Sequence, residues 1–170
     1  MFRSCLLIAL ALPASTALAQ ETAPGVAYDA QILTTCRAET APQDARSCIG
    51  KASTRCMETP DGSSTAGMVS CLAQELNQWD ALLNASYAAL IDRAAKADAE
   101  LAALGSSAEP SEPRLREAQR KWLVWRDAEC RFVASQWQGG TGAGPAANEC
   151  AMTLTAERAL ALDAMRGDGR

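Results

Sequence analysis

The sequence has 170 residues with 16 Lys or Arg, 20 Asp or Glu and no His, so its formal net charge is -4. This acidic balance argues against nucleic acids and anionic membranes as partners, because both select basic surfaces. The absence of histidine removes the commonest catalytic base and a usual zinc ligand, so we expect neither a metal nor a cofactor. A protein partner, including a cationic one, is compatible with this charge.

The start of the chain has the pattern of a secretory signal peptide. Arg3 precedes an apolar stretch over residues 5–12, and a run of small and apolar residues follows at 17–19. Such a pattern is typical of a signal that is cleaved after a small residue, here Ala19. We therefore expect residues 1–19 to be the Sec-type signal peptide of a bacterial protein that is periplasmic or secreted.

The remaining chain is expected to form one domain without a membrane anchor. The apolar stretch of the signal is shorter than the roughly 20 residues that a spanning helix needs. Gln20 stands where a lipoprotein would carry its lipid-attachment cysteine. Residues 20–27 are expected to be a flexible start, and residues 28–167 are long enough for a single domain with a hydrophobic core.

The cysteines indicate a disulfide framework. With Cys5 assigned to the signal peptide, six cysteines remain, an even number that is typical of disulfides in an exported protein. Six cysteines allow many pairings, so the sequence does not fix the connectivity. Nearest-neighbour pairing predicts the bonds Cys36–Cys48, Cys56–Cys71 and Cys130–Cys150. No CxxC motif occurs, which argues against a thioredoxin-type redox site.

Hydrophobic spacing predicts helices from the first ordered residues onward. Residues 28–57 read as two short helices with little apolar content, which local disulfides would support. The sequence Pro-Asp-Gly-Ser-Ser at 60–64 predicts a turn. After it, apolar residues recur every three or four positions, which predicts a long amphipathic helix over about 65–104.

Two further long helices are expected. Gly, Ser and Pro residues at 105–113 should reverse the chain into a helix over about 113–137. The glycine-rich stretch 139–145 should end that helix, and a third helix is predicted over about 147–166. No strand precedes the glycines and no Gly-Lys-Ser/Thr follows them, so we interpret them as a connector. The expected fold is all-α: an antiparallel bundle of three main helices with a disulfide-stapled N-terminal helical segment.

The four tryptophans divide into two pairs. Trp79 and Trp122 fall on the apolar faces of the predicted helices, so we assign them to the core. Trp125 and Trp137 lie to the side of those faces. Because tryptophan is a frequent hot spot of protein interfaces, these two are the candidate surface-binding residues.

Catalysis has weak support in the sequence. A serine nucleophile would need a base such as Lys51 beside Ser47 or Ser53, and a carboxylate pair would need Asp127 near Glu157. Lysines and serines that are close on a helix are commonplace, and carboxylates beside arginines are more simply explained as ion pairs. We therefore expect no catalytic residues and no enzyme.

A set of spaced residues on the three long helices goes beyond generic helix patterning. The positions are Cys71, Glu75, Trp79, Asp80, Leu83, Asn84 and Tyr87 on the first, Leu115, Gln119, Arg120, Trp122, Arg126, Asp127 and Cys130 on the second, and Cys150, Leu154, Arg158 and Leu162 on the third. This pattern resembles the LprI-type lysozyme inhibitor family over roughly residues 48–165.

The resemblance implies a small helical envelope protein that binds another protein. The family takes its name from a member credited with inhibiting lysozyme, so the implied partner is a lysozyme-type, peptidoglycan-cleaving enzyme. If that enzyme is cationic, its charge complements the acidic chain. The chain departs from the namesake by lacking the lipid-attachment cysteine and by adding the segment around Cys36 and Cys48. The alternative function is an envelope structural or adaptor module that binds a protein without inhibiting muramidases.

The shared residues also have an interpretation in folding alone. Trp122 would pack in the core, and the cysteines would form disulfides. Arg126 and Arg158 can form ion pairs with Glu75, Asp80 or Glu157. On this interpretation the pattern specifies the fold better than it specifies a target.

Overall fold

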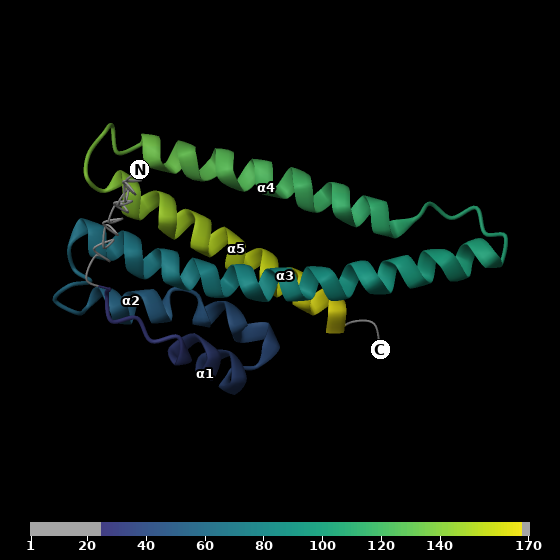
Figure 1. The fold of residues 1–170 in the computed structure, drawn as a ribbon, viewed down its shortest axis with the longest axis horizontal. Coiled ribbons are helices and arrows are strands. Elements are labelled where there is room, and N and C mark those ends of the chain that lie inside the picture. Colours follow the sequence, from purple (N-terminus) through teal and green to yellow (C-terminus); the bar gives the residue numbers. More distant parts are fainter. Residues whose placement is uncertain (1–24, 168–170) are drawn as a thin grey trace, which may run out of the picture.

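Three long helices dominate the computed structural model, which describes residues 25–167. They are α3 (Thr65–Ala103), α4 (Ser111–Ser135) and α5 (Ala143–Gly167), and successive helices run antiparallel (Figure 1). Helix α5 packs mainly along α3 and also against α4. The described residues contain helices and no strands, so the predicted all-α bundle is confirmed. The predicted signal peptide lies outside the described residues.

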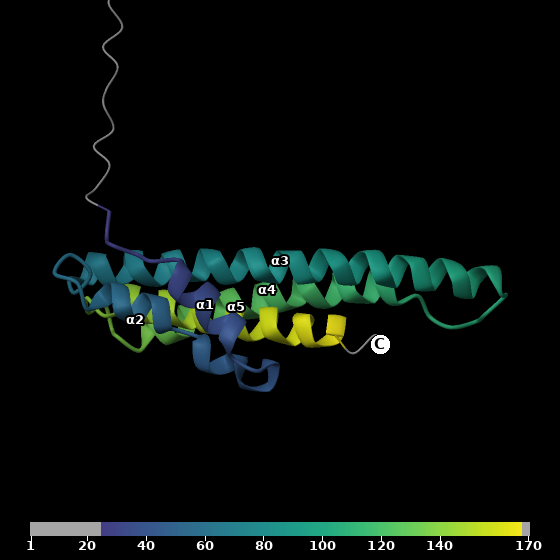
Figure 2. The same cartoon turned by 90° about the horizontal axis from the view of Figure 1, so that it is seen from below.

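A shorter N-terminal segment lies against α3 on the side away from α4 (Figure 1). It consists of α1 (Gln31–Glu39), a 3-10 helix η1 (Pro42–Cys48) and α2 (Lys51–Met57), and Figure 2 shows it from below. The prediction of two short helices missed η1. Proline at the first position of η1 starts the tight turn, and 3-10 helices of this kind commonly serve as connectors between α-helices.

Three disulfides join elements that follow one another in the chain. They are Cys36–Cys48 between α1 and η1, Cys56–Cys71 between α2 and α3, and Cys130–Cys150 between α4 and α5. The paired cysteines are 12, 15 and 20 residues apart. These are the nearest-neighbour pairs, so each bond closes a short loop and none crosses the bundle.

The core is centred on α3 and α5. Trp79 and Leu83 of α3 are fully buried, as are Ala156 and Leu162 of α5. The small alanine side chain lets α5 lie close to α3, and the side chains of one tryptophan and two leucines fill the remaining space. Trp79 is therefore a core residue, as the apolar spacing predicts.

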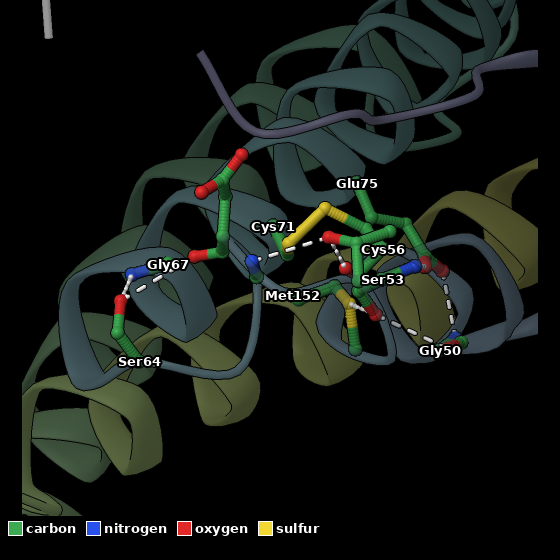
Figure 3. Close-up of a disulfide and its surroundings, with 11 residues drawn as sticks. Gly50, Ser53, Cys56, Ser64, Gly67, Cys71, Glu75 and Met152 are labelled. Atoms are coloured by element: carbon green, nitrogen blue, oxygen red, sulfur yellow. Dashed lines mark hydrogen bonds between the residues drawn. A yellow bond between two sulfur atoms is a disulfide. The ribbon is translucent and has the colours of Figure 1, made fainter. Parts of the chain in front are cut away.

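A buried carboxylate from α3 caps the beginning of α2 (Figure 3). Helix α2 has Gly50 at its N-cap and no side-chain cap of its own. Glu75 replaces it: Oε1 accepts hydrogen bonds from the backbone N–H of Gly50 at 2.7 Å and from Trp79 Nε1 at 3.0 Å, and Oε2 accepts from the N–H of Ser53 at 2.7 Å. A carboxylate at a helix N-terminus satisfies free N–H groups and complements the helix dipole.

Helix α4 is capped from α3 in the same way. Asp98 accepts hydrogen bonds from the backbone N–H groups of Ser111 and Glu112, at 2.9 and 2.8 Å, and from the Ser111 hydroxyl at 2.9 Å. These bonds, led by the one from Glu112, lower the pKa of Asp98. The cap explains why α4 begins at Ser111, two residues before the predicted start, with Pro113 inside its first turn.

Helix α5 also begins earlier than predicted. It starts at Ala143, so Gly144 and Pro145 belong to its first turn and the connection from α4 is only 136–142. Proline is tolerated there because the first helical N–H groups have no partner within the helix. The glycine-rich stretch therefore ends α4, as predicted, but only part of it is a loop.

The far end of α3 extends past the end of α5 (Figure 1). Arg93 donates hydrogen bonds to the backbone carbonyls of Met165 at 2.7 Å and Arg166 at 3.2 Å, which satisfies the last turn of α5. Beyond this point α3 continues unbroken to Ala103, close to the predicted end. Among the described residues, no helix combines the length and the apolar character needed to cross a membrane.

Candidate functional site

Several residues of the recurring pattern meet where α4 packs on α5. Trp122 of α4 is half-buried against the core. The guanidinium carbon of Arg126 lies 5.3 Å from the centre of its ring, and that of Arg158, from α5, lies 5.8 Å away. Contacts of this kind between a cation and an aromatic ring are attractive and strengthen as water is excluded. Trp122 therefore receives two cation–π contacts, one from each helix.

Hydrogen bonds extend this cluster across the two helices. Arg126 donates to the buried hydroxyl of Thr155 in α5 at 3.2 Å. Arg158 Nε donates in the other direction, to the side-chain oxygen of Gln119 in α4 at 3.1 Å. Burial lowers the pKa of the Arg158 guanidinium. The cluster fixes how α4 lies on α5.

The predicted ion pairs of these arginines are wrong. Arg126 pairs with its neighbour Asp127 at 2.8 Å, and no carboxylate among residues 25–167 pairs with Arg158. The three expected partners are engaged elsewhere: Glu75 caps α2, Asp80 accepts a hydrogen bond from Asn84 at 2.8 Å, and Glu157 pairs with Arg46 of η1 at 3.0 Å. Helical spacing alone cannot predict which neighbouring element reaches a carboxylate first.

The remaining residues of the pattern lie on α3. Asp80 and Asn84 are bonded to each other at its surface, one helical turn apart. Tyr87, in the next turn, packs against the core and contributes to the raised pKa of Arg116 in α4, whose main cause is the hydrogen bond to Glu112. These positions stabilise α3 and its contact with α4, so they support the bundle and present no reactive group.

The sides of α4 that α5 does not cover are exposed and partly apolar. The exposed fractions are 71% for Val124, 49% for Trp125 and 60% for Phe132. Residues 125 and 132 are seven residues apart, so Trp125 and Phe132 follow one stripe, whereas Val124 lies about 100° around the helix from Trp125, on the side opposite Trp122. Figure 1 shows α4 at the edge of the bundle, with one side free of other helices. Neighbouring exposed apolar side chains make this part of α4 a candidate binding surface.

Two exposed arginines lie on the same side of α4 as Val124. Arg120 lies one turn before Val124, and Arg131 lies two turns after it. Neither forms an ion pair with a carboxylate in the described part of the chain, whereas the nearby Lys121 pairs with Glu117 at 2.8 Å. We call the set Arg120, Val124, Trp125, Arg131 and Phe132 the outer face of α4.

Trp137 lies just after α4 and is 52% exposed. Its ring covers Gly142, where an added Cβ would lie 2.1 Å from a ring carbon. The turn between them is tight, with positive φ at Gln138 and Gly139. Since the Cys130–Cys150 disulfide joins the two helices on either side of this loop, the exposed indole is held in one place.

The sequence singled out Trp125 and Trp137, and the structure exposes both. The sequence pattern included Arg120 only as a member of the recurring set, and it did not single out Val124 or Arg131. A helical projection centred on Trp122 could have found them, because they lie on the opposite side of the same helix. The missing information was which face α5 would cover.

The structure does not bring together the residues that the two catalytic alternatives would need. Ser53 is buried and its hydroxyl donates to the carbonyl of Gly50 at 3.1 Å, while Lys51 is exposed. Asp127 and Glu157 form ion pairs with different arginines, on α4 and on η1. No group of three metal-ligating side chains occurs among the described residues.

Several surface hollows lie around the N-terminal segment. One that is largely apolar has a volume of about 350 Å³ and lies between α1 and α3, bounded by Leu33, Arg37 and Leu82. Its one charged group, Arg37, is paired with Asp163 at 3.3 Å. Nearby, burial and the carboxylates of Glu75 and Asp29 raise the pKa of Tyr28. These features contain no nucleophile beside a base, so the outer face of α4 is the stronger candidate site.

Comparison with known proteins identifies a matching protein family and two relatives. A family model described as "Lysozyme inhibitor LprI" matches residues 56–162. An uncharacterised 17.7 kDa protein from the puhA 5′ region of Rhodobacter capsulatus is 30% identical over 160 residues, which cover 94% of this chain and 93% of the relative. An uncharacterised protein of Rhizobium meliloti is 27% identical over 92 residues, 54% of this chain and 66% of the relative. No solved structure matches.

Proposed function

Because this chain belongs to the LprI family of lysozyme inhibitors, we propose that it is a periplasmic binding protein that inhibits a lysozyme-type, peptidoglycan-cleaving enzyme. The observation that carries the proposal is the exposed apolar stripe on α4, within the matched residues. The three disulfides support an oxidising compartment such as the periplasm.

The outer face of α4 has the properties of a binding surface that is ready before the partner arrives. Trp125 and Phe132 are large, have few rotatable bonds and stand on a helix that a disulfide and the Trp122 cluster hold in place. Little side-chain freedom is then lost on binding, which favours affinity. Buried aromatic side chains are also the commonest hot spots of protein interfaces.

The charge of the whole chain supports the same class of partner. With a formal net charge of -4, the protein would be attracted over long range by a cationic lysozyme. Such attraction raises the association rate and weakens as salt screens it. An adaptor that binds another envelope protein through the same stripe remains the second candidate, because the exposure of Trp125 and Trp137 suits it equally.

An inhibition assay tests the proposal. Purified mature protein, with its disulfides intact, is added to lysozymes of the c, g and i types that are clearing a peptidoglycan suspension, at several salt concentrations. We expect at least one type to lose activity at micromolar protein or below, and less so at higher salt. If no type is inhibited at tens of micromolar protein, the inhibitor function is wrong and the adaptor function takes its place.

A matched pair of variants links the inhibition to α4. Trp125→Ala with Phe132→Ala should weaken inhibition by roughly 30-fold or more, since each truncation of an aromatic residue at the centre of an interface costs about 1 kcal/mol or more. Leu104→Ala with Met165→Ala removes two other exposed apolar side chains and should leave inhibition unchanged. If both double variants inhibit equally well, α4 is not the surface that binds the enzyme.

A further inference from the structure

The charge of α4 differs from that of the rest of the protein. This helix has six Lys or Arg against four Asp or Glu, whereas acidic residues outnumber basic ones in both α3 and α5. Its buried side contains Arg126, which is occupied by Asp127 and Thr155. The exposed arginines without ion pairs, Arg120 and Arg131, lie on the outer face. Glu117 and Asp127 lie on the same side of the helix, but they pair with Arg114, Lys121 and Arg126. The two arginines therefore leave unpaired positive charge on this side of an acidic protein.

That combination selects an acidic, partly apolar groove as the complementary surface. Arg120, Val124 and Arg131 lie along one side of α4, and Trp125 and Phe132 lie along the adjacent side, about 100° around the helix. A partner that encloses the helix in a groove therefore meets the aromatic rings and both guanidinium groups. A cation buried without a counter-charge is costly, so the covering surface must supply carboxylates. A helix about 10 Å across fits lengthwise into a groove.

The enzymes that cleave peptidoglycan glycosidic bonds contain such a groove. Their substrate cleft holds a pair of carboxyl groups, one on each side of the scissile bond, one acting as acid and the other as nucleophile or base. Resting on the inhibitor function proposed above, we propose that the outer face of α4 lies in this cleft, with Arg120 and Arg131 against its carboxylates and Trp125 and Phe132 on the surface that sugar rings occupy. Inhibition would then be competitive with substrate.

This placement makes a charge-reversal experiment decisive, because the alternative predicts the opposite sign. If α4 covered some other part of a cationic lysozyme, Arg120→Glu with Arg131→Glu would strengthen binding. In the cleft, the same change sets glutamates against carboxylates and weakens binding. Lys51→Glu with Lys96→Glu is the matched control: it changes the net charge equally, at two exposed lysines on α2 and α3 that form no ion pair among residues 25–167.

The measurement is the inhibition constant of each variant against a lysozyme that the wild type inhibits, together with substrate-dependent kinetics. We expect the arginine variant to inhibit roughly 100-fold more weakly, in line with about 1.4 kcal/mol at each position, half from the lost attraction and half from the added repulsion. The lysine control should inhibit as well as the wild type or better. Wild-type inhibition should raise KM without lowering kcat, and an N-acetylglucosamine oligosaccharide should displace the protein.

The outcomes separate this inference from the function on which it rests. If the wild type inhibits but the arginine variant inhibits equally or better, or if kcat falls while KM is unchanged, the cleft placement is overturned and the inhibitor function stands. If the wild type inhibits no lysozyme, the inhibitor function itself fails. The double variant Arg120→Ala with Arg131→Ala, expected to inhibit roughly 10-fold more weakly, checks that lost attraction as well as added repulsion weakens binding.

Discussion

Replacing Glu75 by glutamine should lower the free energy of unfolding by about 3 kcal/mol, because a buried acceptor of three hydrogen bonds is replaced by a group that is half donor. The carboxylate accepts from Gly50, Ser53 and Trp79, and its relative exposure is 0%. An amide of the same shape turns its NH2 toward at least one of these N–H donors. The first turn of α2 then loses its cap, and the N-terminal segment loses its attachment to α3.

Urea unfolding of the oxidised protein, followed by far-ultraviolet circular dichroism, measures this effect. Glu100→Gln, at an exposed position farther along the same helix, is the matched control and should change the free energy of unfolding by less than about 0.5 kcal/mol. A loss below about 1 kcal/mol for Glu75→Gln would mean that Glu75 is not the cap of α2.

Reducing the three disulfides should unfold most of the protein at room temperature. The bonds close loops of 12, 15 and 20 residues, and loops of this size each stabilise a fold by about 3 kcal/mol in the chain-entropy model. Together they approach the roughly 5–15 kcal/mol that is typical of the whole net stability of a domain. The N-terminal segment should be lost first, because its few buried apolar side chains supply little stability of their own.

Circular dichroism before and after reduction and alkylation tests this expectation, with the alkylated but unreduced protein as control. A single bond can be removed separately: Cys130→Ala with Cys150→Ala should cost about 3 kcal/mol and leave the helices formed. It should also free the loop that holds Trp137. A reduced protein with full helical content and an unchanged urea midpoint would show that apolar packing alone stabilises the bundle.

Much of the helical architecture could be predicted because it follows from local spacing. The steps of three and four from Met68 to Leu104 specify α3, and the structure ends that helix within one residue of the prediction. Trp79 and Trp122 fall on its core-facing side and on that of α4 for the same reason. Patterns of this kind depend only on the geometry of one helix, so the sequence contains them in full.

The parts that the sequence could not predict depend on contacts between distant residues. The starts of α2 and α4 are set by Glu75 and Asp98, which are 25 and 13 residues from the N–H groups of Gly50 and Ser111 that they cap. The same distance effect explains the wrong ion pairs, because the fold brings Arg46 to Glu157 and leaves Arg158 with an amide partner. No local sequence pattern predicts such contacts between distant residues.

The candidate site was predictable in part. Trp125 and Trp137 could be named because they lie off the apolar faces, whereas Arg120 and Arg131 looked like ordinary solvated charges. Their place on the exposed side of α4 is known only once the Trp122 cluster shows which side of the helix packs against α5. The net charge of the chain is acidic although α4 is basic, because a sum over all residues does not report where the charges lie.

The most direct test of the proposed binding face is hydroxyl-radical labelling of the protein alone and with excess lysozyme, read by mass spectrometry. We expect Trp125 and Phe132 to be labelled freely in the protein alone and to be protected in the complex, while exposed Met165 is labelled equally in both. Equal labelling of Trp125 and Phe132 with and without lysozymes of every type would contradict binding through α4.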